Sequence, residues 1–245
     1  MKFFSHHFFH NETNDRSEKG MVHVPKDRSL WPAAWTKINY KRYSLFPSIP
    51  LTRQQSFFFN EILAHRWSST GSVEGNVITQ ETLSYMLQCG YGLQGNQKSG
   101  RQENRTVPSA GKRYPLEIYS FLFQTIETLH PGVYHYAVKE HSLEPVLKTS
   151  FSRETIDSFS SMEWLSEANG MIVLTGVFSR VAMKYGSRGY RYILLEAGHV
   201  AQNMLLAGTE KQINMIPLGG VNEEVIEEYM GLNTLDERVV YVLSF

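Results

Sequence analysis

The stretch RYILLEAGHVAQNMLLAG, residues 191–208, carries the clearest structural signal in the chain. Its apolar residues recur at the spacing of one helical face, at Ile193, Ala197, Val200, Ala201, Met204 and Leu205. Small residues occur at Ala197, Gly198, Ala201, Ala207 and Gly208. The pattern predicts a long helix with one buried face, and its small side chains would let a second helix approach closely.

A second strong signal is GMIVLTGVF, residues 170–178, an uninterrupted apolar run. Such a run is typical of a central strand that is covered on both faces. Further strands are predicted over 117–123, 133–138, 142–147 and 239–245, of which the middle two form a hairpin. Helices are predicted over 54–65, after an N-cap at Thr79, and over 223–230. This order of elements predicts an α+β fold with a mixed or antiparallel sheet.

The chain of 245 residues divides into a predicted N-terminal arm, residues 1–52, and one folded domain, residues 53–245. The first 30 residues are polar and have little to bury, and prolines interrupt the stretch that follows. The aromatic residues with which this arm would dock on a partner protein are Trp31, Trp35, Tyr40 and Tyr43.

Composition argues against several functional classes. Lys plus Arg and Asp plus Glu both total 24, so the net charge is zero and no nucleic-acid binding is expected. No apolar run reaches the ~20 residues of a membrane helix, and no signal peptide is recognisable, so we expect a cytoplasmic protein. The single Cys89 is interpreted as a buried thiol. Neither a metal-binding cluster nor a Rossmann fingerprint is present in the sequence.

Two segments contain residues suited to holding a cofactor. Arg66, Ser68 and Ser69 follow a predicted helix end, where they could grip a phosphate or form an ordinary polar turn. The segment of Pro108, Ser109, Ala110 and Gly111 is small enough for the backbone to approach a flat ligand. It could equally be a plain loop that enters a strand.

Two further segments have chemical potential. Lys184 and Tyr185 are adjacent and could transfer protons, or they could belong to a charged lead-in to the following helix. Gly219 and Gly220 stand between an apolar segment and a helix. Their backbone donors could meet a cofactor, or they could form a tight turn.

The order and joint spacing of these segments resemble the SagB-type dehydrogenases, the thiazole- and oxazole-forming branch of the FMN-dependent nitroreductase superfamily. The resemblance covers roughly residues 60 to 245. Its most specific parts are VPSAGKRYPLEIY (107–119), GVYHY (132–136), YRYILLEAGHVAQNMLL (190–206) and IPLGGVNEEVIEEYMGL (216–232).

The resemblance implies an α+β sandwich with a mixed, mostly antiparallel sheet flanked by helices, and an obligate homodimer with FMN at the subunit interface. It assigns Arg66 and Ser68 to the FMN phosphate, with Ser69 assisting. The residues assigned to the isoalloxazine ring are Pro108, Ser109, Ala110 and Gly111. Those assigned to backbone donation near the reactive edge of the flavin are Gly219 and Gly220.

Two departures from the family pattern concern the phosphate. Thr70 stands where many nitroreductases have a second basic residue, and no basic residue follows the last predicted strand, which ends at Phe245. A second cation must then come from another position. The candidates, among which the sequence does not choose, are Lys112, Arg113, Arg188 and Arg191.

The azoline-oxidising members of this branch carry a Lys-Tyr pair, which Lys184 and Tyr185 match. Aromatising an azoline removes a proton beside the carbonyl and a hydride from the neighbouring ring carbon. The flavin accepts the hydride, so the protein must supply a positioned base. Which of Lys184 and Tyr185 is the base is left open.

The resemblance therefore predicts an FMN-dependent oxidase that converts a thiazoline or oxazoline to the azole, with dioxygen reoxidising the flavin. The ring would be borne by a ribosomal peptide, with a cyclodehydratase partner, or by an intermediate on a nonribosomal peptide synthetase. Two alternatives stay open. One is an NAD(P)H-dependent nitro- or quinone reductase, and the other is a non-catalytic flavoprotein subunit of a biosynthetic complex.

Overall fold

The computed structural model describes residue 10 and residues 27–30, 58–68, 78–94 and 104–245, and the structural statements below concern these residues. Ser69, Thr70 and nearly all of the predicted N-terminal arm lie outside them. The arm's aromatic residues, Trp31, Trp35, Tyr40 and Tyr43, also lie outside them. The arm and its boundary at residue 53 therefore stay predictions.

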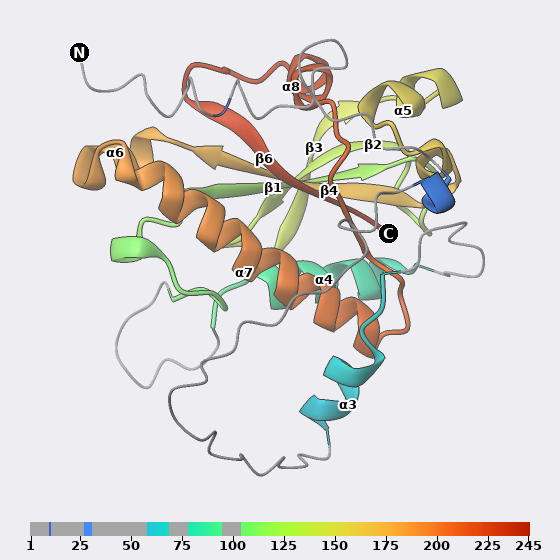
Figure 1. Ribbon diagram of the computed structural model, residues 1–245, viewed down its shortest axis with the longest axis horizontal. Helices are drawn as coiled ribbons and strands as arrows, with labels where there is room; N and C mark the ends of the chain where they lie inside the picture. The colour runs from blue at the N-terminus through green and yellow to red at the C-terminus, as the bar shows by residue number, and fades with distance from the viewer. Residues whose placement is uncertain (1–9, 11–26, 31–57, 69–77, 95–103) are drawn as a thin grey trace.

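Six described strands form one sheet at the centre of the fold (Figure 1). They are β1 (Leu116–Leu122), β2 (Gly132–Ala137), β3 (Ser142–Lys148), β4 (Gly170–Val177), β5 (Ile216–Leu218) and β6 (Glu237–Ser244). Their order across the sheet is β3-β2-β1-β4-β6-β5, and every neighbouring pair is antiparallel. The five predicted strands are confirmed. Of the mixed or antiparallel sheet that the pattern predicts, the described strands form the antiparallel one, and the parallel pairing that the resemblance implies is not found among them.

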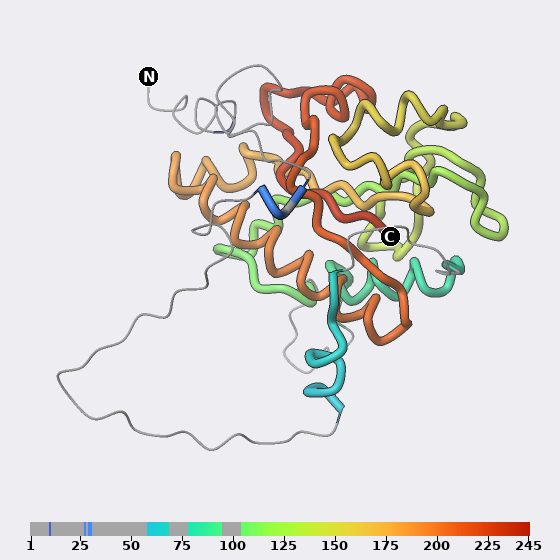
Figure 2. The backbone as a smooth tube through the Cα atoms, turned by 45° about the vertical axis from the view of Figure 1, so that its right-hand side comes forward, coloured from blue at the N-terminus to red at the C-terminus, as the bar shows by residue number. Residues whose placement is uncertain are grey.

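Helices cover both faces of this sheet. They are α3 (Phe59–His65), α4 (Gln80–Tyr91), α5 (Arg153–Phe159), α6 (Ser179–Tyr185), α7 (Arg188–Glu210) and α8 (Glu223–Met230), with short 3₁₀ turns η1 (Arg28–Leu30), η3 (Ala110–Lys112) and η4 (Glu163–Glu167). Figure 1 shows α7 crossing the sheet diagonally, with α4 beside it and with α5 and α8 at the opposite side of the sheet. The tube in Figure 2 shows the same separation from another direction.

The central strand β4 explains why an antiparallel sheet carries an uninterrupted apolar run. Ile172 and Leu174 belong to the core that α4 and α7 form with the sheet. Met171 and Val173 point to the opposite core, which α5 and α8 complete. Successive side chains of a strand alternate between faces, so a strand covered on both sides is apolar throughout. Double coverage, rather than parallel pairing, is therefore the source of the apolar run.

Local capping confirms where two helices begin. Thr79 Oγ1 accepts a hydrogen bond from the Thr82 amide at 3.1 Å, and the Thr79 amide donates to Thr82 Oγ1 at 2.9 Å. Asn222 caps α8 by accepting from the Val225 amide, and α8 ends before Gly231, whose φ of 65° suits a left-handed cap. The short elements α5, α6 and β5 were not predicted.

The two longest described helices, α4 and α7, pack closely because a glycine stands at their contact. Gly90 is buried against Met204 of α7, and a Cβ placed on Gly90 would lie 2.5 Å from both Cγ and Cε of Met204. Asn203 Nδ2 donates to the Cys89 carbonyl at 3.2 Å across the same contact. Cys89, predicted to be buried, is half-buried, and burial raises the pKa of its thiol. None of the described helices is long and apolar enough to span a membrane.

The α4–α7 contact yields a stability prediction. Gly90→Ala should lower the free energy of unfolding by about 1–3 kcal/mol, because Met204 Cγ lies close to its own backbone and cannot move aside freely. Thermal and denaturant unfolding measure the change. Gln88→Ala, at an exposed position of the same helix, is the matched control and should alter stability little. Equal stability of the Gly90→Ala variant and the wild type would contradict the close contact.

Candidate active site

The 104–115 loop, which leads into β1, is tightly wound around η3. Its φ angles are positive at Gly111 (61°), Lys112 (55°) and Tyr114 (44°), a conformation that glycine adopts most readily. Ser109 Oγ accepts a hydrogen bond from the Tyr114 amide at 2.9 Å and closes the turn. Lys112 Nζ donates to Asn104 Oδ1 at 2.6 Å. The predicted segment 108–111 is therefore part of a constrained turn and not a plain extended loop.

Four side chains hold this loop in place, two of them from α4 and α7 and two from the loop itself. Tyr91, at the end of α4, donates its hydroxyl to Glu196 Oε1 at 2.7 Å and accepts from the Leu116 amide at 3.2 Å. The Arg105 guanidinium lies 4.1 Å from the centroid of the Tyr91 ring and 4.9 Å from that of Tyr114, within cation–π range of both. We call Tyr91, Arg105, Tyr114 and Glu196 the loop anchor.

Glu196 is a charged residue type on the apolar face of α7. It is only 2% exposed, and within the described part of the chain its Oε2 has no hydrogen-bond partner. Burial raises the pKa of its carboxyl group, and the hydroxyl groups of Ser109 and Tyr91 and the charge of Arg105 oppose this rise only in part. Arg105 Nη1 likewise lacks a hydrogen-bond partner among the described residues. The loop anchor thus contains buried polar groups whose hydrogen-bonding capacity is only partly used.

Lys184 and Tyr185 occupy the last turn of α6 and converge on this loop. A Cβ placed on Gly111 would lie 2.6 Å from the Tyr185 hydroxyl and 2.9 Å from Lys184 Nζ. The Tyr185 ring packs edge-on against Tyr192 of α7, with centroids 5.0 Å apart. Two segments that are some 70 residues apart in sequence are therefore brought into contact at Gly111. A glycine there leaves both polar tips room to meet the loop.

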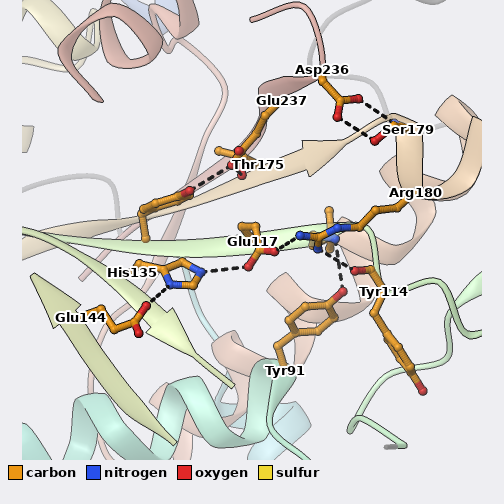
Figure 3. Close-up of polar contacts among 12 residues, drawn as sticks. Tyr91, Tyr114, Glu117, His135, Glu144, Thr175, Ser179, Arg180, Asp236 and Glu237 are labelled. Carbon is orange, nitrogen blue, oxygen red and sulfur yellow. Dashed lines mark hydrogen bonds and ion pairs between the residues drawn. The ribbon is translucent and has the colours of Figure 1, made fainter. Parts of the chain in front are cut away.

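Helix α6 is tied to the rest of the site at its first turn (Figure 3). Arg180 forms an ion pair with Glu117 of β1, and its Nη1 donates to the Tyr114 carbonyl at 3.2 Å. Asp236 accepts from the Ser179 amide at 2.7 Å and from the Ser179 hydroxyl at 2.6 Å. The helix that carries Lys184 and Tyr185 is thus joined to the same loop that they touch.

The predicted phosphate-binding residues lie elsewhere on the chain. Arg66 and Ser68 follow α3, and Arg66 Nη1 donates to Ser68 Oγ at 3.2 Å. Figure 1 shows α3 at the bottom of the molecule, away from α6. No described contact joins Arg66 or Ser68 to the 104–115 loop, and Ser69 lies outside the described residues.

The predicted glycine turn is also separate from the loop. Gly219 and Gly220 follow β5, and the Gly220 carbonyl accepts from the Ser160 hydroxyl at 2.6 Å and from the Ser161 amide at 3.0 Å. A Cβ placed on Gly219 would meet no atom within 4 Å, so the backbone here faces open space. Among the described residues, no contact joins this turn to Gly111 or Lys184.

The second cation for a phosphate is still undecided among its four candidates. Lys112 is engaged by Asn104, and Arg188 lies 6.0 Å from the Tyr192 ring centroid. Arg113 and Arg191 are exposed. No group of three or more potential metal-ligating side chains is found in the described ranges of the chain.

Several site residues were missed from sequence: Tyr91, Arg105, Glu117, Arg180 and Glu196. Glu196 left a signal, because a glutamate between Ile193 and Val200 interrupts the apolar face of an amphipathic helix. The others left none, since their roles depend on pairings between elements distant in sequence.

A sheet covered by α4 and α7 on one face and by α5 and α8 on the other, with these loops at its ends, is the architecture of nitroreductase-like oxidoreductases. The chain belongs to the nitroreductase family, whose family model matches residues 64–245. It is 30% identical over 153 residues to the nitroreductase-like protein MJ1384 of Methanocaldococcus jannaschii, covering 62% of this chain and 74% of that protein.

A second relative is the microcin B17-processing protein McbC of Escherichia coli, which is 30% identical over 141 residues. The match covers 56% of this chain and 50% of McbC, so the chain spans about half the length of that relative. The SagB-type, McbC-like resemblance found in the sequence is thus confirmed.

Solved structures share the fold. A chain of the Escherichia coli microcin synthetase McbBCD complex, solved with truncated pro-MccB17 bound, has a TM-score of 0.70 at 23% identity, covering 98% of this chain and 90% of that chain. A nitroreductase-fold protein from Desulfovibrio desulfuricans, solved in complex with FMN, has a TM-score of 0.53 at 12% identity, covering 78% and 86%. At these identities the likeness shows the fold alone.

The buried Glu196 generates a pH prediction. Because the pKa of Glu196 is raised in the folded state, the folded protein binds this proton more tightly than the unfolded chain does. The resulting stabilisation is complete below pH 4.5, the ordinary glutamate pKa, and is lost as the pH rises through the raised pKa. In Glu196→Gln this loss should be absent, so the variant should gain stability relative to the wild type as the pH rises across that window. Denaturant unfolding at a series of pH values measures the difference.

The matched control for this experiment is Glu154→Gln, at an exposed glutamate of α5. This variant shows the effect of removing a glutamate from the protein surface, without the burial that surrounds Glu196. A Glu196→Gln difference that does not change with pH, or changes no more than the Glu154→Gln difference, would contradict the raised pKa of Glu196.

Proposed function

We propose that this protein is an FMN-dependent azoline oxidase that converts a peptide-borne thiazoline or oxazoline to the corresponding azole. The observation that carries the proposal is the convergence of Lys184 Nζ and the Tyr185 hydroxyl on Gly111. Two groups able to move protons are thereby placed at the loop that is assigned to the isoalloxazine ring.

The residues present fit a flavin mononucleotide. Gly111 lets the polar ends of Lys184 and Tyr185 reach the loop assigned to the ring, and Gly219 offers backbone beside open space. Arg66 and Ser68 form a guanidinium–hydroxyl pair that could turn to a phosphate. A bound flavin supplies the hydride acceptor and passes the two electrons to dioxygen, which becomes hydrogen peroxide.

The remaining chemistry falls to the side chains of this chain. Aromatisation breaks two C–H bonds of the azoline: one hydrogen leaves as a proton from the carbon beside the carbonyl and the other leaves as a hydride from the neighbouring carbon. Either Lys184 or Tyr185 takes the proton at its Nζ or hydroxyl oxygen, and the other orients the ring. The balance is azoline plus dioxygen giving azole plus hydrogen peroxide, so no NAD(P)H is consumed.

The relatives support a peptide substrate and a multiprotein setting. McbC is named as a microcin B17-processing protein, and the similar McbBCD structure is a synthetase complex with a truncated pro-peptide bound. By analogy, the ring would be formed by a cyclodehydratase partner or on a nonribosomal peptide synthetase before this protein oxidises it. The predicted N-terminal arm is the candidate docking segment.

A homodimer belongs to the proposal because the predicted FMN contacts do not meet within one described chain. Helix α3, which precedes Arg66, has no buried residue although it contains Phe59 and Leu63. Trp67, immediately after Arg66, is 75% exposed. Leu194 and Leu195 of α7 are exposed on the side facing away from the core. A second copy covering these apolar side chains would also bring Arg66 and Ser68 toward another chain's 104–115 loop.

A nitro- or quinone reductase is the second candidate, favoured by the 30% identity to MJ1384. The two functions differ in the source of electrons. Rapid bleaching of the bound flavin by NADPH without oxidation of thiazolines would favour the reductase.

The Lys184–Tyr185 pair gives the decisive activity prediction. Purified protein with bound flavin, given a small thiazoline peptide under air, should form a thiazole two mass units lighter. Lys184→Ala and Tyr185→Phe should each lower kcat by about 100- to 10,000-fold, because removing a positioned general acid or base costs this much. Mass spectrometry follows the product, and the visible spectrum checks that flavin is retained.

Met183→Ala is the control for these variants, because Met183 is on the same helix and is 88% exposed. It should keep both turnover and flavin. A wild-type protein that retains flavin but oxidises no azoline would refute the oxidase proposal and favour the reductase or a non-catalytic subunit.

The dimer has its own test. Light scattering should give the wild type twice the chain mass of 28.2 kDa. Leu63→Glu should shift it to a single chain and release flavin, because a charge would be buried against the partner. Val146→Glu is the control, at an apolar residue of similar exposure on β3. A wild-type monomer that binds flavin would contradict the proposed dimer.

A further inference from the structure

Apolar packing holds helix α6 through two side chains, the buried Val181, and Tyr185, whose ring packs against Tyr192 of α7. The helix contains seven residues, and Val181 is its only buried side chain. Helices this short are marginal by themselves, so external contacts must set their orientation. Yet the last turn of α6 carries Lys184 and Tyr185, whose tips must be held against Gly111.

Polar contacts at the first turn supply what packing does not. Asp236 holds the Ser179 end through two hydrogen bonds. Arg180 makes two contacts at once, one to the Glu117 carboxylate on β1 and one to the Tyr114 carbonyl in the 104–115 loop. Only Arg180 links α6 to both the sheet and the loop among these contacts, as Figure 3 shows.

Glu117 is itself fixed on its other side. Its Oε2 pairs with His135 Nε2 at 2.9 Å, and His135 Nδ1 pairs with Glu144 Oε2 at 2.9 Å. Burial alone would raise the pKa of Glu117, but the hydrogen bond from His135 and the Arg180 charge outweigh it and lower that pKa. Glu117 is therefore an ionised, half-buried acceptor with a set orientation, to which Arg180 can be directed.

We propose that Arg180 is a positioning residue, which by joining Glu117 and the Tyr114 carbonyl orients α6 and sets Lys184 and Tyr185 against Gly111. The catalytic role of this orientation rests on the proposed function. The attachment of α6 by Arg180, which we call the α6 clamp, does not rest on it. The Arg180 guanidinium is already engaged by two acceptors, so Arg180 is not proposed as the base. Its effect must pass through the helix.

The test measures α6 directly as well as turnover. Arg180→Gln, Glu117→Gln and the double variant are compared with the wild type as full-length, flavin-loaded protein. Hydrogen exchange of the α6 backbone amides should accelerate by about 10-fold or more in both single variants, and the double variant should resemble either one because they remove the same link. Exchange in α7 should stay unchanged, which shows that the fold is intact.

Turnover supplies the second measurement. With a thiazoline peptide, kcat should fall by about 10-fold or more while KM changes less than about threefold, since misplacing catalytic groups affects the chemical step more than binding. Arg180→Lys, which keeps the charge but cannot make both contacts, should be intermediate in exchange and in kcat. Arg153→Gln removes an exposed ion pair with Asp157 on α5 and should match the wild type.

The outcomes separate the two proposals. Unchanged α6 exchange in Arg180→Gln overturns the positioning role, whether or not kcat falls. Faster exchange with unchanged kcat also overturns it, because α6 orientation would then not matter for the reaction. A wild type that oxidises no thiazoline refutes the proposed function, while hydrogen exchange still shows whether the α6 clamp exists.

Discussion

Burial of β4 on both faces is the constraint on which the rest of the molecule depends. Each side of this strand needs its own apolar cover, so α4 and α7 pack on one face and α5 and α8 on the other. The position of α7 then follows from the core, and with it the position of Glu196 beneath the 104–115 loop. A site at the edge of the sheet is thus supported by an element whose own place is set by apolar packing.

The candidate site itself is held by a different kind of interaction. Its loop has three residues with positive φ, and α6 has a single buried side chain. Neither would keep a defined geometry by packing alone. Tyr91 and Glu196 hold the loop through contacts that include its own Arg105, while Arg180 and Asp236 hold α6 at its first turn. Polar contacts with angular preference can hold groups in place where the surface must stay open to a ligand.

Prediction from sequence succeeded where one local pattern determines one element. The helix over 191–208, the strand over 170–178 and the Thr79 cap each reflect periodicity or a local hydrogen bond, and each is confirmed. The pattern left the sheet mixed or antiparallel, because an apolar run reports only that both faces are covered, not which way the neighbouring strands run. The short α6 was missed because seven residues with one buried side chain have no measurable periodicity.

The sequence by itself determined the family, the main helices and strands, and the residue types available for chemistry, because these depend on local pattern and on the order of motifs. Only the tertiary structure decided that Lys184 and Tyr185 meet Gly111 while Arg66 and Gly219 stand apart from them. It also decided that Arg180 pairs with Glu117, 63 positions earlier in the chain. Such pairings depend on how the sheet and helices pack. The local sequence around a residue does not indicate which distant residue it will contact.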